Sequence, residues 1–135
     1  MFRFETVIRL AHTDAAGIIF YGRLFDLIHF AYEAMLDDIG FPLPTDVAQA
    51  PVVLPIVHAS ADYRSPLRLN DRVDIEVAVE KVGERSFTLG YRVTAGDQVC
   101  VEARTVHVAV SRVDYKAAPL PDELARELRS RIASR

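Results

Sequence analysis

The run from Arg23 to Ile39 constrains the fold most, because it reads as a helix that is apolar on most of its surface. Except for Asp38, its polar residues recur three or four positions apart and form one stripe, which covers roughly a third of the helix circumference. The members of that stripe are Arg23, Asp26, His29, Glu33 and Asp37. Gly40 and Pro42 then signal the end of the helix. Such a helix must be covered by other structure on most of its sides.

Most of the remaining chain alternates apolar and polar residues with a period of two, which is typical of strands. The expected strands are residues 2–10, 53–64, 72–81, 85–95 and 98–111, with a loop at 41–51 and an amphipathic helix at 122–133. Short turns at 69–71, 82–85 and 95–98 predict that the strands they join are antiparallel neighbours.

The length of 135 residues predicts a single domain that spans 1–135. One curved antiparallel sheet has to cover the long helix on one side. The other face of the sheet, or its edge strands, then has to meet a second subunit. The pattern therefore predicts an α+β homodimer.

Composition narrows the classes of partner and cofactor. The net charge of −3 gives no reason to expect nucleic acid or an anionic membrane as a partner. Cys100 is the only cysteine, which excludes an intrachain disulfide and a cysteine-based zinc site. Glu5 and Arg9 interrupt the N-terminal apolar residues, so we expect neither a signal peptide nor a membrane span, and a cytoplasmic protein.

We also expect no metal and no bound cofactor. His29 and Glu33 are four residues apart and could share a helix face, but no HExxH motif or close histidine pair accompanies them. The sequence contains neither a phosphate-binding glycine loop nor a dinucleotide fingerprint.

The stretch "HTDAAGIIFYG" places a carboxylate, Asp14, a short distance before the long helix. Gly17 permits a tight turn between the two. The first N–H groups of a helix lack internal partners, carry partial positive charge and can hold an anion. A carboxylate beside such groups supplies the two parts that acyl transfer needs, an attacking group or base and an oxyanion hole. On spacing alone, the commoner alternative is an acid that merely caps the helix.

The residues "DAAGIIFYGRLFDLIHFAYEAML" resemble the start of the hotdog-fold acyl-CoA thioesterases of the 4-hydroxybenzoyl-CoA thioesterase type. Further along, "LPIVHASADYRSPLRLNDRV" is similar to the strand–turn–strand that follows in that family. The blocks "EARTVHVAV" and "KAAPLP" resemble the 1,4-dihydroxy-2-naphthoyl-CoA thioesterase subgroup of quinone synthesis. The resemblance covers nearly the whole chain. It implies a hotdog fold, an antiparallel sheet wrapped around a long central helix, in homodimers that assemble to homotetramers.

The resemblance also implies residue roles. Asp14 corresponds to the catalytic carboxylate, which either attacks the thioester carbon or deprotonates the attacking water. The backbone N–H of Tyr21 corresponds to the donor that polarises the thioester carbonyl, and Gly17 supplies the turn. The leaving thiolate departs without a strong general acid, so one carboxylate and aligned N–H donors are sufficient.

Three histidines and one arginine complete the candidate site. On a strand, His12 would share the face of Asp14 and, if charged, would favour the ionised carboxylate. His29 and His58 match the naphthoyl subgroup and are expected to bind the substrate's ring hydroxyls. Each of the three has a plain alternative, as a solvated, interface or core histidine. Arg85 is the first choice for the CoA phosphates. The other cations considered are Arg64, Arg68, Arg112 and Lys116.

The expected activity is hydrolysis of an aromatic acyl-CoA, with 1,4-dihydroxy-2-naphthoyl-CoA first. The alternatives are 4-hydroxybenzoyl-CoA or a short-chain acyl-CoA as the substrate. Less favoured are a hotdog dehydratase and a non-catalytic module that binds acyl-CoA.

Overall fold

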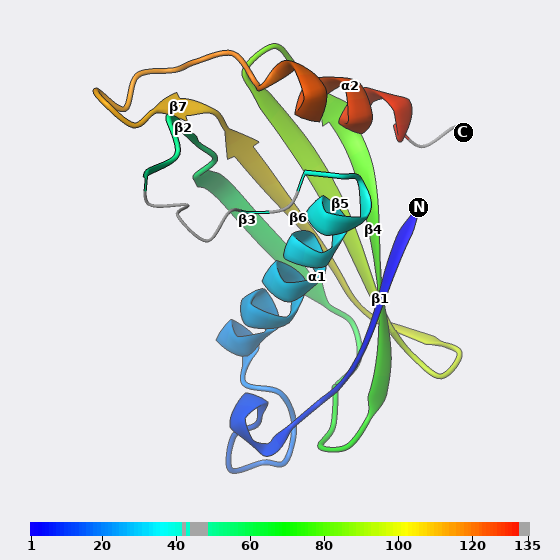
Figure 1. Ribbon diagram of the computed structural model, residues 1–135. Helices are drawn as coiled ribbons and strands as arrows, with labels where there is room; N and C mark the ends of the chain where they lie inside the picture. The colour runs from blue at the N-terminus through cyan, green and yellow to red at the C-terminus, as the bar shows by residue number, and fades with distance from the viewer. Residues whose placement is uncertain (42, 44–48, 133–135) are drawn as a thin grey trace.

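A five-stranded antiparallel sheet curves behind one long helix in the computed structural model (Figure 1). The structure describes residues 1–41, 43 and 49–132. In spatial order the strands are β1 (Phe2–Val7), β4 (Arg72–Val82), β5 (Ser86–Ala95), β6 (Gln98–Val108) and β3 (Ile56–Tyr63). A separate two-stranded sheet pairs β2 (Val52–Val53) with β7 (Val110–Ser111). The helices are α1 (Leu24–Asp38) and α2 (Asp122–Ser130), and the 3-10 turns are η1 (Leu10–His12) and η2 (Tyr21–Arg23).

Helix α1 packs one face against the concave side of the sheet, as its apolar surface requires. The buried residues of α1 are Leu24, Leu27, Ile28, Ala31, Tyr32, Met35 and Leu36. Each fully buried leucine stabilises the fold by roughly 2 kcal/mol. The polar stripe faces solvent, but so does Phe30, which is 56% exposed. One chain therefore covers α1 on one side only, and not on most of its sides as the sequence indicated.

Strands β4, β5 and β6 form the antiparallel meander that their short connections predicted. In β4, Val73, Ile75, Val77 and Val79 are buried, and the residues between them are more exposed. This period of two confirms that one face of the sheet belongs to the core.

The neighbour expected for the strand at 53–64 was wrong. β3 pairs with β6, and the edge of β4 where β3 was expected is occupied by β1. The turn at 69–71 does exist, with Asn70 at a φ of 72°. It bonds to the residue that follows β1, since the Asn70 N–H donates to the Ile8 carbonyl at 2.9 Å. Residues 64–71, between β3 and β4, therefore cross the molecule, and we call them the crossing segment. Its Leu67 is fully buried and packs in the core.

Element boundaries also differ from the predictions. The first strand ends at Val7 and not at residue 10, because η1 follows it. The strands predicted at 53–64 and 98–111 are each divided, since their outer residues pair as β2 and β7. Of the predicted loop at 41–51, residues 42 and 44–48 lie outside the described residues, as does residue 133 of the predicted final helix.

Helix α2 lies across the end of the sheet where β4 meets β5 (Figure 1). Asp122 and Glu123 stand in its first turn, where negative charge favours the helix. Leu124, Ala125 and Leu128 are buried on its inner side. Within the part of the chain that the structure describes, neither helix is long and apolar enough to cross a bilayer.

Candidate active site

Asp14 begins a tight turn that Gly17 closes. The Gly17 N–H donates to the Asp14 carbonyl at 3.1 Å, and the Asp14 N–H donates to the Ile18 carbonyl at 3.0 Å. Gly17 has a φ of 81°, a conformation that costs glycine little and other residues more. The Ala16 N–H donates to one carboxylate oxygen of Asp14 at 2.8 Å, which fixes the side chain over its own turn.

The turn returns the chain to the start of α1. Thr13 pairs with Ile19, and the Phe20 N–H donates to the His12 carbonyl at 2.8 Å. Asp14 is exposed, and no cation among the described residues lies within ion-pair distance of it. Its second carboxylate oxygen accepts no hydrogen bond from the described residues, so it is open to a substrate or a water molecule.

The start of α1 supplies hydrogen-bond donors. η2 runs directly into α1, so Tyr21 and Gly22 stand in the first turn of one continuous helical segment. Within the described chain no acceptor bonds to their backbone N–H groups. Such groups attract negative charge, including the oxygen of a polarised carbonyl. The phenol ring of Tyr21 is exposed and packs beside Phe20, with the ring centroids 4.8 Å apart.

A groove of ≈ 450 Å³ on the outward face of α1 brings His12 and His29 together. The other residues that line it are Ala11, Arg23, Phe25, Asp26, Phe30 and Glu33. Arg23 and Asp26 form an ion pair at 3.2 Å. The groove thus combines two aromatic side chains with groups that can hydrogen-bond to a ring hydroxyl.

His12 is not on a strand that continues to Asp14, so the predicted sharing of a face is wrong. It ends η1, and its Nδ1 accepts a hydrogen bond from the Arg9 N–H at 2.9 Å. An accepting Nδ1 places the ring proton on Nε2. The first strand ends early because this local bond favours a 3-10 turn.

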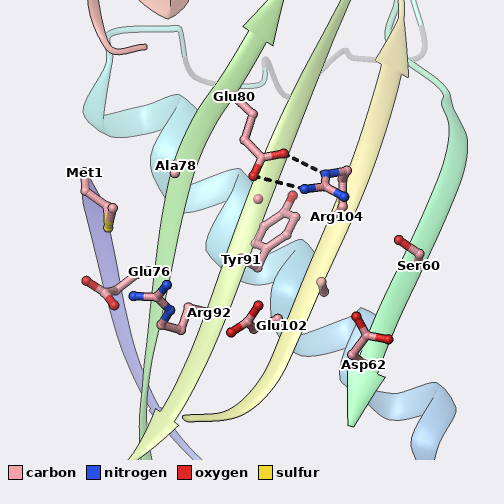
Figure 2. A pocket seen from close by; sticks show the side chains of 12 residues that line it. Met1, Ser60, Asp62, Glu76, Ala78, Glu80, Tyr91, Arg92, Glu102 and Arg104 are labelled. Carbon is pink, nitrogen blue, oxygen red and sulfur yellow. Dashed lines mark hydrogen bonds and ion pairs between the residues drawn. The ribbon is translucent and has the colours of Figure 1, made fainter. Parts of the chain in front are cut away.

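His58 and Arg85 lie away from His29 within one chain. On β3, His58 pairs with Val106, and the residues of this face, Ser60 and Asp62, line the outer side of the sheet (Figure 2). α1 lies on the other side. Arg85 precedes β5, at the end of the sheet near α2, and α1 begins near the opposite end (Figure 1).

The outer face of the sheet carries a charged hollow of ≈ 280 Å³ (Figure 2). Arg104 bonds to Glu80 through two nitrogens, at 2.7 and 3.4 Å. The Glu80 side chain lies over Gly90, where a Cβ would come within 2.5 Å of a carboxylate oxygen. The absence of a side chain at Gly90 therefore makes room for this ion pair.

Sequence reasoning missed a buried polar chain between the sheet and α1. The Tyr91 hydroxyl lies 2.9 Å from Thr105 Oγ1, which lies 2.8 Å from His107 Nε2. The His107 ring is fully buried and stacks on Phe87, with centroids 4.6 Å apart. A histidine and a threonine among the otherwise apolar inward positions of β6 were the signal that could have revealed it.

Burial sets the protonation states of these hydrogen-bonded side chains. It lowers the pKa of His107 to about 4, and the nearby His29 contributes in the same direction. It raises the pKa of Tyr91 to about 12, against the opposing effect of the hydrogen bond to Thr105. His107 Nδ1 makes no hydrogen bond with the described residues, and the Leu54 backbone partly opposes the lowering of the His107 pKa. At neutral pH the side chains of Tyr91, Thr105 and His107 are all uncharged.

Among the described residues, no three histidine, cysteine, aspartate or glutamate side chains gather as a metal site would require. The family model of the Thioesterase-like superfamily matches residues 8–128, from the end of β1 to α2. The chain belongs to this superfamily.

Two relatives of the chain have the same name. A 1,4-dihydroxy-2-naphthoyl-CoA hydrolase from Synechococcus elongatus is 35% identical over 124 residues, which cover 91% of each protein. One from Microcystis aeruginosa is 34% identical over 121 residues, covering 90% of this chain and 88% of the relative. A crystal structure of a 1,4-dihydroxy-2-naphthoyl-CoA thioesterase from Synechocystis superposes with a TM-score of 0.88 at 28% identity, and covers 94% of both chains. The hotdog thioesterase fold implied by the sequence is confirmed.

Proposed function

We propose that this chain is an acyl-CoA thioesterase and that 1,4-dihydroxy-2-naphthoyl-CoA is its substrate. The observation that carries the proposal is the 35% identity over 91% of both chains to a hydrolase of that thioester. The Asp14 turn and the free N–H groups at the start of α1 support it, because thioester hydrolysis needs an attacking group or base, which a carboxylate can supply, and an oxyanion site.

In this proposal Asp14 starts the reaction in one of two ways. As a nucleophile, its free carboxylate oxygen bonds to the thioester carbon while the carbon–sulfur bond breaks. The electron pair leaves with sulfur as the CoA thiolate, and water then cleaves the mixed anhydride to the acid. As a general base, Asp14 instead takes a proton from the water that attacks the thioester carbon. In both cases the Tyr21 N–H receives the charge that develops on the carbonyl oxygen.

We assign the ring hydroxyls of the substrate to the groove that His12 and His29 line. A site that hydrogen-bonds a hydroxyl discriminates strongly against analogues that lack it, because its own polar groups are then left unpaired. His58 and Arg85 remain proposed contacts to the ring and to the CoA phosphates. Their distance from His29 makes these two contacts depend on a second copy of the chain.

We further propose that the protein forms homodimers, which pair into homotetramers. β3 is an edge strand, and Val57 on it is 61% exposed. An apolar edge with free backbone groups is suited to pairing with another strand. Light scattering after gel filtration should give the mass of two or four chains. Val57→Lys should shift it toward one chain, and a wild-type protein that runs as a monomer would contradict the proposal.

The buried Cys100 suits a reducing compartment, and we propose the cytoplasm as the site of action. Fractionation of the source cells with an antibody to the protein would test this. Recovery of the protein outside the cytoplasmic fraction would contradict it.

Steady-state kinetics over a panel of acyl-CoA esters tests the substrate. We expect the highest kcat/KM for 1,4-dihydroxy-2-naphthoyl-CoA, with a lower value for 4-hydroxybenzoyl-CoA and the lowest for butyryl-CoA. A preference for butyryl-CoA would exclude the aromatic assignment. Binding of every ester without turnover would instead identify a module that only binds acyl-CoA, and turnover of an enoyl-CoA would indicate a hydratase.

A further inference from the structure

The peptide groups at the start of α1 are held by their carbonyl oxygens. The Phe20 carbonyl accepts the Arg23 N–H at 2.8 Å, and the Tyr21 carbonyl accepts both the Leu24 N–H and the hydroxyl of Tyr63. Because a peptide group is planar and trans, its N–H points away from its carbonyl. Holding these two carbonyls therefore sets the directions of the Tyr21 and Gly22 N–H groups.

Tyr63 reaches this point from 42 residues away in the sequence. It is the last residue of β3, and the next two N–H groups, of Arg64 and Ser65, donate to the Cys100 carbonyl at 2.8 and 3.1 Å. These bonds fix Tyr63 to the end of the sheet.

The crossing segment adds a second tie between the sheet and the helix start. The Ile19 N–H donates to the carbonyl of buried Leu67 at 2.8 Å, and Ile18 pairs with Arg68. Backbone hydrogen bonds thus hold the chain both next to Tyr63 and before Tyr21. The Tyr63 hydroxyl therefore keeps a fixed position relative to the Tyr21 carbonyl.

The phenol is also in the protonation state that donation requires. Partial burial, followed by the neighbouring Tyr21 phenol, raises the pKa of Tyr63 above its ordinary value near 10. A hydrogen bond to a peptide carbonyl also polarises that peptide and strengthens its N–H as a donor.

We propose that Tyr63 is a positioning residue for thioester hydrolysis. Its hydroxyl holds the Tyr21–Gly22 peptide so that the N–H groups at the start of α1 stay directed at the carbonyl oxygen of the substrate. This inference rests on the proposed thioesterase function. It adds Gly22 as a second N–H donor in the oxyanion site, beside Tyr21.

The first test compares Tyr63→Phe with Tyr115→Phe. Tyr115 is exposed, and its hydroxyl makes no hydrogen bond with the described residues, so its variant controls for the loss of a phenol oxygen alone. Removing a direct oxyanion donor costs about 10²–10³ in kcat, and losing its support should cost about tenfold. KM should stay within about twofold, because the substitution keeps the ring and removes only the hydroxyl. Tyr115→Phe should match the wild type in both.

The second test reads the polarisation of the carbonyl directly. Benzoyl-CoA labelled with carbon-13 at the thioester carbonyl is bound to Asp14→Asn, which hydrolyses it slowly, and its infrared stretch is measured. We expect a shift to lower wavenumber than in water, and a smaller shift when Tyr63→Phe is added. A role limited to stability would change the melting temperature and leave this shift unchanged.

The outcomes separate the two proposals. If the wild type fails to hydrolyse aryl-CoA esters, or Asp14→Asn is fully active, the proposed function fails. If the wild type is active, Asp14→Asn is not, and Tyr63→Phe keeps the wild-type kcat or the full carbonyl shift, only the role of Tyr63 is overturned.

Discussion

Two polar regions lie beside the apolar core: the start of α1, and the hydrogen-bonded side chains of Tyr91, Thr105 and His107. They differ in whether their hydrogen-bonding groups have partners within the protein. At the helix start, the Tyr21 and Gly22 N–H groups and one Asp14 oxygen have no partner among the described residues. Among the buried side chains, the Tyr91 and Thr105 hydroxyls and His107 Nε2 bond to one another, and of their polar atoms only His107 Nδ1 is left without a hydrogen bond within the described chain.

The difference follows from solvent. An unpartnered group at the surface is hydrated, whereas a buried one costs roughly 1–3 kcal/mol. A site that receives a substrate therefore keeps its free groups at the surface, where water satisfies them until the ligand arrives. The buried side chains contribute to stability. Substitutions at the helix start should therefore change catalysis, and substitutions of the buried side chains should change stability.

The largest expected effect is on catalysis. Asp14→Asn removes the attacking group or base and should lower kcat by about 10³-fold. The melting temperature should hardly change, because the amide oxygen can still accept from Ala16. Stopped assays of acyl-CoA hydrolysis measure the rate, with Asp97→Asn in the exposed β5–β6 turn as a control. Retention of more than a tenth of wild-type activity would mean that another group starts the reaction.

Buried His107 should make the stability of the protein depend on pH. The pKa of His107 is about 4 in the folded protein and about 6.5 when unfolded, so the unfolded state binds the extra proton between these values. Stability should be full above pH 6.5 and fall by up to about 3 kcal/mol as pH drops toward 4. Urea unfolding at several pH values measures this. His107→Gln should flatten the slope and exposed His58→Gln should not; equal slopes in all three proteins would refute the assignment.

Gly17→Ala tests whether the turn serves the site as well as the fold. An alanine at a φ of 81° should cost about 1 kcal/mol. Gly96→Ala, at a φ of 61° in the β5–β6 turn, is the matched control. Both should lose similar stability in urea unfolding, but only Gly17→Ala should also lose turnover. Equal turnover in the two variants would separate the turn from catalysis.

The smallest effect is expected on the outer face of the sheet. The Glu80–Arg104 pair is partly exposed, and such pairs contribute roughly 0.2–1 kcal/mol. A double-mutant cycle with Glu80→Gln and Arg104→Gln should give a coupling energy in that range, with wild-type kcat throughout. A loss of activity would connect this face to the catalytic site.

The parts of the fold that the sequence predicted are those decided locally. The meander of β4, β5 and β6 follows from short turns, and α1 follows from its stripe of polar residues. The partner of β3 was mispredicted because a period of two identifies a strand but not its neighbour. Only the three-dimensional structure shows that β1 already occupies the edge of β4.

The candidate site divides in the same way. The Asp14 turn can be recognised because its parts are close in sequence and resemble a family motif. The contact of Tyr63 with Tyr21 joins a strand end to a helix start, and no periodicity reports such a contact. His107 escaped notice because single polar residues on inward positions do not alter the alternation of a strand.

The long separation between Tyr63 and Tyr21 has a consequence for how the protein acquires its activity. The Asp14 turn joins residues a few positions apart and can close early in folding. The start of α1 is fixed only when β3, β6 and the crossing segment have come together, and such distant contacts form slowly. A chain emerging from the ribosome should therefore form its Asp14 turn well before its oxyanion donors are aligned. Catalytic activity should appear only at the end of folding.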